Sequence, residues 1–310
     1  MLYPRKKSDG LMITLTLMDS GNILFEGKIC AVALEKLHLH EEILEPNVVS
    51  VMNLLRKRQL FQDPIIVDEN SLVVLDGMHR VTALRRLNYD FIIAYLVDYF
   101  NPLIKVRRWC RIFSINNKVN HSLMENLISS IRNSFDADVK LCKVHEGEAL
   151  LNEREVIGYL YAPPLRETYC ISCNGVKDIM KIYRLLREIE SYIASTINAD
   201  ISYAPDESIN DFSSEKNLIL VPPQIKKIEV IRYATKGIVF PPKTTRHIIP
   251  LRPFFVNIPL NLLRKSHLVS SLKRLNNIID TILLQKEGIR LQGKIIIDRF
   301  YEDDFIYIFL

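Results

Sequence analysis

The chain has 310 residues, of which 48% are hydrophobic and 25% are charged, and its formal net charge is +5. These values are typical of a folded globular protein, and the length predicts about two domains. The mild positive charge suits anionic small ligands but is too low to indicate a nucleic-acid partner by itself. The most continuous apolar run, Phe91 to Phe100, contains Asp98 and falls well short of the roughly 20 residues that span a bilayer.

No uncharged apolar stretch of signal-peptide length follows the basic residues 5–7, so we expect a cytosolic protein with reduced thiols. The cysteines are Cys30, Cys110, Cys142, Cys170 and Cys173. Their odd number and wide scatter are unlike a disulfide framework. Cys170 and Cys173 have CxxC spacing, but no second pair of Cys or His completes a zinc site, which disfavours a metal or redox role.

The N-terminal part predicts a hairpin, a strand and a helix. Two strand-like runs, Leu11 to Leu17 and Asn22 to Phe25, flank a polar turn. We expect a further strand from Ile29 to Leu37. Apolar residues at helical spacing then predict a helix from about Asn47 to Gln59, with Pro46 in its first turn.

A second hairpin follows this helix. The β-branched runs Pro64 to Val67 and Leu72 to Leu75 are separated by a polar tight turn. We expect a short amphipathic helix from His79, with Asn88 as a left-handed cap at its end. Phe91 to Val97 then predicts a buried strand.

The remainder of the chain mixes both kinds of element. Apolar faces predict a long helix marked by Val176 to Ile193 and another marked by Leu268 to Ile282. The chain is expected to close in a hairpin of Lys294 to Asp298 and Phe305 to Phe309. This mixture of strands and helices predicts an α+β fold.

The segment Asp76-Gly77-Met78-His79-Arg80 joins a predicted strand to a predicted helix. Free N–H groups and the dipole at a helix N-terminus favour a phosphate, and glycine lets the backbone approach it closely. Arg80 can add a bidentate contact and His79 a donor. The alternative is a helix capped by Asp76 that carries two surface bases.

An Asp-Gly-x-His-Arg segment after a hairpin resembles the ParB/sulfiredoxin fold, and the likeness covers about Leu34 to Trp109. Sulfiredoxins carry a reactive Cys inside this loop, where this chain has Met78. ParB-type nucleotide switches are usually followed by a helix-turn-helix, and none is recognisable after Trp109. Neither of these two functions is therefore favoured.

The segment His38-Leu39-His40-Glu41-Glu42 narrows the resemblance to the free L-serine kinases, archaeal and siderophore-pathway members among them. The resemblance implies that Glu41 is the catalytic base, a task that a carboxylate within hydrogen-bond reach can perform. Alternatively, Glu41 and Glu42 only favour the N-terminus of the next helix. A metal site at His38 and His40 would need a third ligand that the segment does not supply.

A third segment, from Pro241 to Pro250, is similar to the Pro-Lys-Thr-Thr-Arg-His run of the archaeal serine kinases. The four residues that match its end are Thr244, Thr245, Arg246 and His247. Arg246 offers a planar fork to a carboxylate or phosphate, and the threonines offer hydroxyl donors. Taken alone, the run could be a polar turn before Ile248.

The resemblance implies a ParB/sulfiredoxin-like N-terminal domain (1–110), a mixed α/β C-terminal domain (111–310) and an active-site cleft between them. In the implied reaction Gly77, Met78, His79 and Arg80 cradle the phosphates of ATP or ADP, and ATP is favoured over ADP. The same resemblance implies that Asp76 assists Mg²⁺ or the serine hydroxyl and that residues 244–247 bind serine. The product would be O-phospho-L-serine, for cysteine biosynthesis.

Two alternative functions are also compatible with the sequence. The acceptor could be another small hydroxylated metabolite, or the chain could be a ParB-like nucleotide-binding regulator that contacts DNA. The sequence predicts neither an oligomeric state nor a role for the residues after about 264, which match little in the family.

Overall fold

The computed structural model describes residues 3–8, 12–266, 269–293, 295–297 and 300–310. The chain forms two compact units that interleave in the sequence. The first unit comprises Met1–Lys105, Val230–Val239 and His247–Leu310, and the second comprises Val106–Glu229 and Phe240–Arg246. The chain crosses between them within β8 (Lys105–Arg107), within α6 (Lys227–Ala234), between Val239 and Phe240, and within β15 (Arg246–Ile248). The domain boundaries 1–110 and 111–310 stay a prediction.

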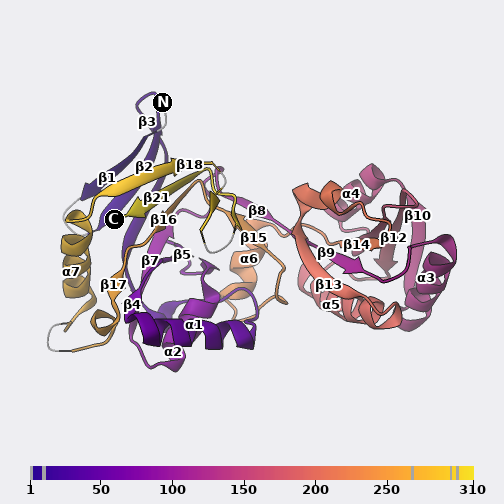
Figure 1. The fold of residues 1–310 in the computed structure, drawn as a ribbon, viewed down its shortest axis with the longest axis horizontal. Coiled ribbons are helices and arrows are strands. Elements are labelled where there is room, and N and C mark those ends of the chain that lie inside the picture. The colour runs from indigo at the N-terminus through magenta and orange to yellow at the C-terminus, as the bar shows by residue number, and fades with distance from the viewer. Residues whose placement is uncertain (1–2, 9–11, 267–268, 294, 298–299) are drawn as a thin grey trace. The chain divides into compact units, whose positions relative to one another are not determined.

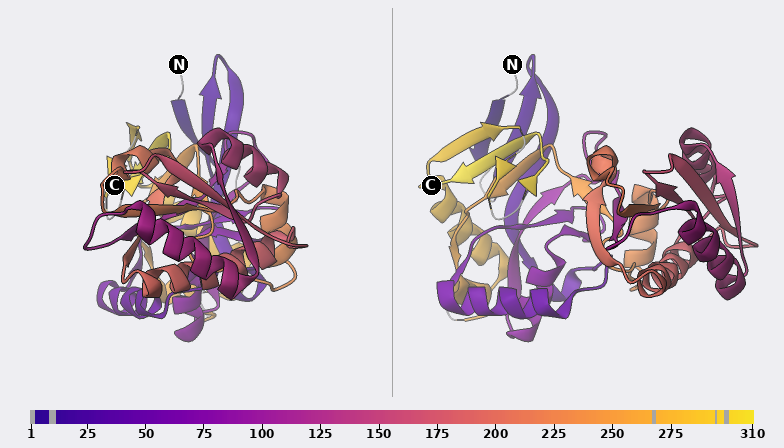
Figure 2. Two further views of the ribbon diagram at one scale, coloured as in Figure 1. Left: turned by 90° about the vertical axis from the view of Figure 1, so that its right-hand side faces the viewer. Right: turned by 45° about the vertical axis from the view of Figure 1, so that its right-hand side comes forward.

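A six-stranded sheet of order β1-β2-β3-β7-β5-β6 forms the centre of the first unit (Figure 1). Its strands are β1 (Tyr3–Ser8), β2 (Ile13–Asp19), β3 (Asn22–Ala33), β5 (Ile65–Asp68), β6 (Val74–Asp76) and β7 (Phe91–Val97). Among its pairs, β5 and β7 run parallel, and the others are antiparallel. Figure 2 shows the turn of the β2–β3 hairpin projecting beyond the rest of this unit.

The predicted N-terminal hairpin is confirmed for its described residues, but the two strands expected at Asn22 to Phe25 and Ile29 to Leu37 are one continuous strand, β3. Gly27 lies in the middle of β3, where a Cβ atom would stand only 2.2 Å from the ring of Tyr95. Glycine here admits the neighbouring aromatic ring and does not break the strand. The strand ends earlier than expected, at a 3₁₀ turn, Leu34–Lys36.

The elements that lead to the predicted site agree with the sequence-based expectation. Helix α1 (Glu45–Arg58) has a proline in its first turn, and β5 and β6 form the expected hairpin. Helix α2 (Met78–Arg86) follows directly and lies against α1 (Figure 1). Asn88 adopts the predicted left-handed conformation, with φ of 55°.

The C-terminal part of the first unit adds α7 (Leu272–Leu284), which packs against β3, and a three-stranded sheet of order β16-β21-β18. These strands are β16 (Leu251–Phe254), β18 (Gly288–Gln292) and β21 (Phe305–Phe309). The predicted closing hairpin is wrong, because β21 pairs with β16 and β18. The predicted first strand forms only β19 (Ile295–Ile296), which pairs with β20 (Phe300–Tyr301), and residues 294 and 298 lie outside the described residues. Two more short strands, β4 (Leu60–Phe61) and β17 (Ile258–Pro259), pair with each other, and a 3₁₀ turn at Leu260–Leu263 follows.

The second unit is built on a six-stranded antiparallel sheet of order β10-β12-β11-β14-β9-β13. The strands are β9 (Trp109–Ser114), β10 (Ala137–Cys142), β11 (Gly158–Ala162), β12 (Glu167–Cys173), β13 (Asp200–Pro205) and β14 (Asn217–Val221). The helices are α3 (His121–Phe135), α4 (Val144–Glu153) and the long predicted helix α5 (Ile179–Thr196), with a 3₁₀ turn at Asp206–Phe212. Alternate strand residues contribute to two separate apolar clusters, one containing α3 and α5 and the other α4.

The described elements together form a mixed α+β protein with several sheets. In the part of the chain that the structure describes, no helix has both the length and the apolar character needed to cross a membrane.

A disulfide joins Cys142 of β10 to Cys170 of β12 in the second unit. The expectation of five reduced cysteines is therefore wrong for this pair. The sequence suggested no pairing because the partners are 28 residues apart and meet only when the strands pair antiparallel. The CxxC spacing of Cys170 and Cys173 does not reflect a bond between them, since Cys173 has a free thiol.

Reduction of this disulfide is expected to lower the stability of the second unit by about 3 kcal/mol, because closing a loop of this size restricts the unfolded chain by roughly that amount. The measurement is thermal unfolding with and without a thiol reductant. Cys142→Ser should show the lower melting temperature in both conditions, whereas Cys173→Ser should keep the reductant dependence of the natural chain. A natural chain that melts identically in both conditions would contradict the prediction.

Candidate active site

The Asp-Gly segment lies at the junction of β6 and α2, as predicted. Gly77 has φ of +100°, and a Cβ atom at this position would lie 2.5 Å from Cγ2 of Ile65. Both features require glycine. Gly77 is the N-cap residue of α2 and has no side chain that could cap the first turn. Asp76 is therefore not the N-cap residue, and its carboxylate contacts Arg80 and Arg252. Backbone N–H groups at a helix start can bind an anion, and phosphate binding by residues 77–80 stays a prediction.

The side chains around this turn hold it to its neighbours. Arg80 Nη1 donates to the carbonyl oxygen of Asp63 at 2.8 Å, and Arg80 Nη2 lies 3.5 Å from Asp76 Oδ2. His79 Nε2 accepts from the backbone N–H of Leu44 at 3.0 Å. When the ring is neutral its proton must therefore be on Nδ1, which is the nitrogen that can donate to an anion. The contacts of Arg80 with Asp63 and Asp76 hold the turn in place, in addition to any contact that Arg80 makes with a ligand.

The structure brings the Glu41 segment to the same turn. The segment runs beside the start of β6, because His38 forms a parallel bridge with Val73, the residue before this strand. The backbone N–H of Glu41 then donates to Sδ of Met78 at 3.3 Å. The Glu41 residue is 7% exposed. The backbone of Glu41 therefore lies at the start of α2, although the two segments are more than thirty residues apart in sequence.

His247 belongs to the first unit and approaches the Glu41 segment through His40. The His40 and His247 rings meet edge to face at 5.2 Å, and His247 Nε2 is 2.7 Å from the hydroxyl of Tyr99. His40 Nδ1 is hydrogen-bonded to the carbonyl oxygen of Val74, and His40 Nε2 lies 3.9 Å from Glu41 Oε1. Burial lowers the pKa of His40 despite this carboxylate. The ring is therefore neutral near pH 7 and donates to the carbonyl through Nδ1.

The rest of the predicted substrate segment lies in the second unit. Thr244 and Thr245 are buried, and Thr244 Oγ1 donates to the carbonyl oxygen of Pro241 at 2.7 Å. The carbonyl oxygen of Thr245 accepts from Nε1 of Trp109. Arg246 lies over the Trp109 ring, with its Cζ atom 5.7 Å from the centroid. These contacts fix the segment in place. A turn at residues 242–243 precedes β15, so the alternative of a polar turn before Ile248 stays open and serine binding by this segment stays a prediction.

Two adjacent acidic residues, Asp206 and Glu207, contact three arginines of the second unit. Arg246 Nη2 contacts both, at 3.2 Å from Asp206 Oδ1. Arg107 binds Glu207, and Arg108 lies 3.5 Å from Asp206. Burial and the neighbouring Glu207 raise the pKa of Asp206. This acidic pair was not predicted from the sequence, because nothing in the local pattern shows that residues about 40 positions before Arg246 face it.

Sequence reasoning also missed Arg252 and Asp303, which contact Asp76 or each other in the first unit. No cluster of three or more His, Cys, Asp or Glu side chains in the described ranges could hold a metal ion.

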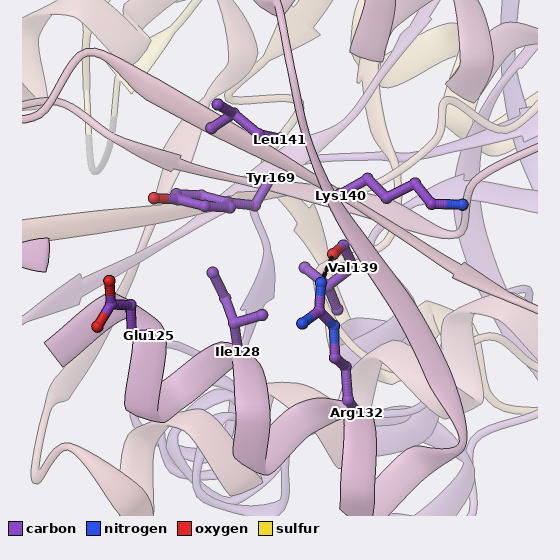
Figure 3. A pocket seen from close by; sticks show the side chains of 7 residues that line it. All are labelled: Glu125, Ile128, Arg132, Val139, Lys140, Leu141 and Tyr169. Carbon is purple, nitrogen blue, oxygen red and sulfur yellow. Dashed lines mark hydrogen bonds between the residues drawn. The ribbon is translucent and has the colours of Figure 1, made fainter. Parts of the chain in front are cut away.

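The second unit also contains a pocket of about 610 Å³ between α3, β10 and β12 (Figure 3). It is lined by Glu125, Ile128, Arg132, Val139, Lys140, Leu141 and Tyr169. None of the site residues predicted from the sequence lines it.

No family model matches the chain. The chain is 30% identical over 242 residues to an ATP-dependent L-serine kinase of Staphylothermus marinus, a match that covers 74% of this chain and 89% of the relative. The chain belongs to the L-serine kinase family. The resemblance identified from the three sequence segments is thereby confirmed.

Other comparisons agree with this family assignment. An ADP-dependent L-serine kinase of Thermococcus kodakarensis is 22% identical over 236 residues, which cover 74% of this chain and 90% of the relative. The solved structure of a free serine kinase in complex with AMP matches with a TM-score of 0.56 at 20% identity, covering 76% of this chain and 93% of that one. This structural likeness shows that the two proteins share a fold.

Proposed function

We propose that this member of the L-serine kinase family transfers the terminal phosphoryl group of ATP or ADP to the hydroxyl of free L-serine. The observation that carries the proposal is the contact between the Glu41 segment and the first turn of α2. It brings a candidate general base to a glycine-led helix start that suits phosphate. ATP is the favoured donor, because the 30% identical relative is ATP-dependent and the 22% identical relative is ADP-dependent.

In the proposed reaction, Glu41 accepts the proton of the serine hydroxyl while the hydroxyl oxygen bonds to the terminal phosphorus. The bond from that phosphorus to its bridging oxygen breaks, and the shortened nucleotide leaves with the electron pair. The N–H groups from Gly77 to Arg80 and the Nδ1 proton of His79 hold the donor phosphates. Positioning and charge stabilisation supply most of the catalysis in such a transfer.

Magnesium fits this site as a companion of the nucleotide. Asp76 would be its protein ligand, because a carboxylate oxygen is a ligand type that Mg²⁺ prefers. The bound ion would neutralise charge on the phosphate oxygens. Asp76 Oδ2 already accepts from Arg252 at 2.6 Å, so most of the remaining ligands would be phosphate oxygens and water.

Thr244, Thr245, Arg246 and His247 are proposed to bind serine, with Arg246 directed to its carboxylate. The proposal also includes a ParB/sulfiredoxin-like core for the first unit, supported by the β5–β6 hairpin that leads into α2. A cytosolic location would suit a kinase of free metabolites.

Arg246→Lys is expected to raise the KM for serine by roughly 10- to 100-fold, because a point charge replaces a fork that makes charge-assisted hydrogen bonds. The measurement is initial rate against serine concentration at saturating nucleotide. Arg107→Lys is the matched control, since Arg107 shares the acidic partners of Arg246. A rise in the nucleotide KM alone would move Arg246 to the phosphate side of the mechanism.

The proposed function is tested by incubating the purified protein with Mg²⁺, L-serine and either ATP or ADP, and by detecting O-phosphoserine by mass spectrometry. Product with one donor would settle the nucleotide. A panel of other small hydroxylated metabolites tests the acceptor. Nucleotide binding without phosphorylation of any acceptor, together with steeply salt-dependent DNA binding, would instead support the regulator alternative.

A further inference from the structure

A buried arginine from the C-terminal part of the first unit contacts Asp76, the last residue of β6. Arg252 lies in β16 and is 6% exposed. Its Nη1 donates to Asp76 Oδ2 at 2.6 Å. Its Nε and Nη2 donate to the two carboxylate oxygens of Asp303, at 2.7 and 3.3 Å. All three guanidinium nitrogens are thus used to join two carboxylates that are 227 positions apart in the sequence.

Asp303 is itself held in place. It is 2% exposed, and its Oδ1 also accepts from the backbone N–H of Ile249 at 2.8 Å. The bidentate contact therefore fixes the plane of the Arg252 guanidinium as well as its position. The ring of Tyr301 lies beside it, with its centroid 5.4 Å from Cζ of Arg252.

The electrostatics keep Arg252 charged. Burial opposes the charge, but Asp303 and Asp76 outweigh it and raise the pKa of Arg252 above its ordinary value. Arg80 faces Asp76 Oδ2 from α2, so cationic and anionic groups alternate along the sequence of contacts from Asp303 to Arg80. A buried ion pair adds little net stability over apolar packing. Stability alone therefore does not explain why Arg252 and its two carboxylate partners are buried together.

We propose that Arg252, locked by Asp303, is a positioning residue that sets the orientation of the Asp76 carboxylate for phosphoryl transfer. The inference rests on the proposed kinase function and deepens it. By holding Oδ2, Arg252 determines where Asp76 Oδ1 points relative to the first turn of α2. The segment around Asp303, to which the sequence assigned no role, thereby becomes part of the catalytic apparatus.

The test uses Asp303→Asn and Arg252→Lys in the full-length chain. Asp303→Asn keeps the shape but places an amide against the guanidinium, and Arg252→Lys cannot bridge both carboxylates. Each is expected to lower kcat by roughly 10- to 100-fold, as a small misplacement of a catalytic group does. The KM for serine should stay within about twofold, because Asp76 is assigned to the Mg²⁺ and phosphate side of the site and not to serine binding. Asp280→Asn, which alters a buried aspartate on α7, is the control and should keep kcat.

A double-mutant cycle separates positioning from general structural damage. In an Asp76→Asn background, Asp303→Asn should change kcat by less than about twofold, because its effect passes through Asp76. An equal loss in both backgrounds would overturn the inference. If the Asp76→Asn enzyme turns over too slowly to measure, the single variants decide, and a change confined to KM would overturn it as well.

The same experiment distinguishes a failure of the proposed kinase function from a failure of the proposed role of Arg252. A natural chain that forms no O-phosphoserine would overturn the kinase function and, with it, this role of Arg252. An active natural chain with variants of unchanged kcat would overturn only the role of Arg252 and Asp303.

Discussion

Glu41→Gln is expected to lower the turnover number for L-serine by roughly 10²–10⁴, the range that a general base contributes. The amide has nearly the shape of the carboxylate but cannot take the proton of the serine hydroxyl. The contact between the Glu41 backbone and Met78 does not involve the substituted atoms, so the local fold should survive. The KM for nucleotide should change little, because the proposed mechanism assigns the phosphates to the α2 turn and not to Glu41.

The measurement is steady-state formation of O-phosphoserine, with thermal unfolding to verify the fold. Glu42→Gln is the matched control, since it removes the neighbouring charge of the same segment and should keep most of the turnover. If Glu41→Gln turned over serine at the natural rate, Glu41 would have no part in the chemistry. If both variants lost activity equally, the loss would come from the reduced negative charge of the segment and not from the removal of a general base.

Local patterns predicted the elements that build the site. Helical periodicity and turn residues depend only on neighbouring positions in the sequence. They therefore predict α1, the β5–β6 hairpin and the start of α2. The likeness of three short segments to one family then suggested Glu41, the Asp-Gly turn and His247. The structure places the first two in contact and joins His247 to the Glu41 segment through His40.

Interactions between distant residues could not be predicted in the same way. The sequence around Arg252 shows only a basic residue beside a proline, and the partners of Arg252 lie 51 and 176 positions away. The Cys142–Cys170 disulfide depends on strand pairing, and β21 takes partners other than its neighbour in sequence. The continuity of β3 through Gly27 was not predicted, because Gly27 admits the Tyr95 ring, which only the paired strands bring near.

Gly77→Ala is expected to raise the KM for nucleotide by roughly 10- to 100-fold, because the backbone at the turn proposed to bind phosphate would have to move. An alanine at φ of +100° carries strain of about 1–3 kcal/mol. Its Cβ would also lie 2.5 Å from Cγ2 of Ile65 and 2.9 Å from Nη2 of Arg80. Relief of these contacts displaces either the first turn of α2 or the Arg80 guanidinium, and both help to define the turn.

Gly21→Ala is the matched control, because Gly21 has a similar φ of +91° in the β2–β3 turn but nothing within 4 Å of an added Cβ atom. Both variants carry the backbone strain, so both should melt at a lower temperature than the natural chain. Only Gly77→Ala should also lose nucleotide affinity, measured by calorimetric titration as well as by KM. Equal loss of stability in the two variants with unchanged nucleotide binding would mean that the α2 turn does not hold the phosphates, and the nucleotide would have to be assigned to another part of the chain.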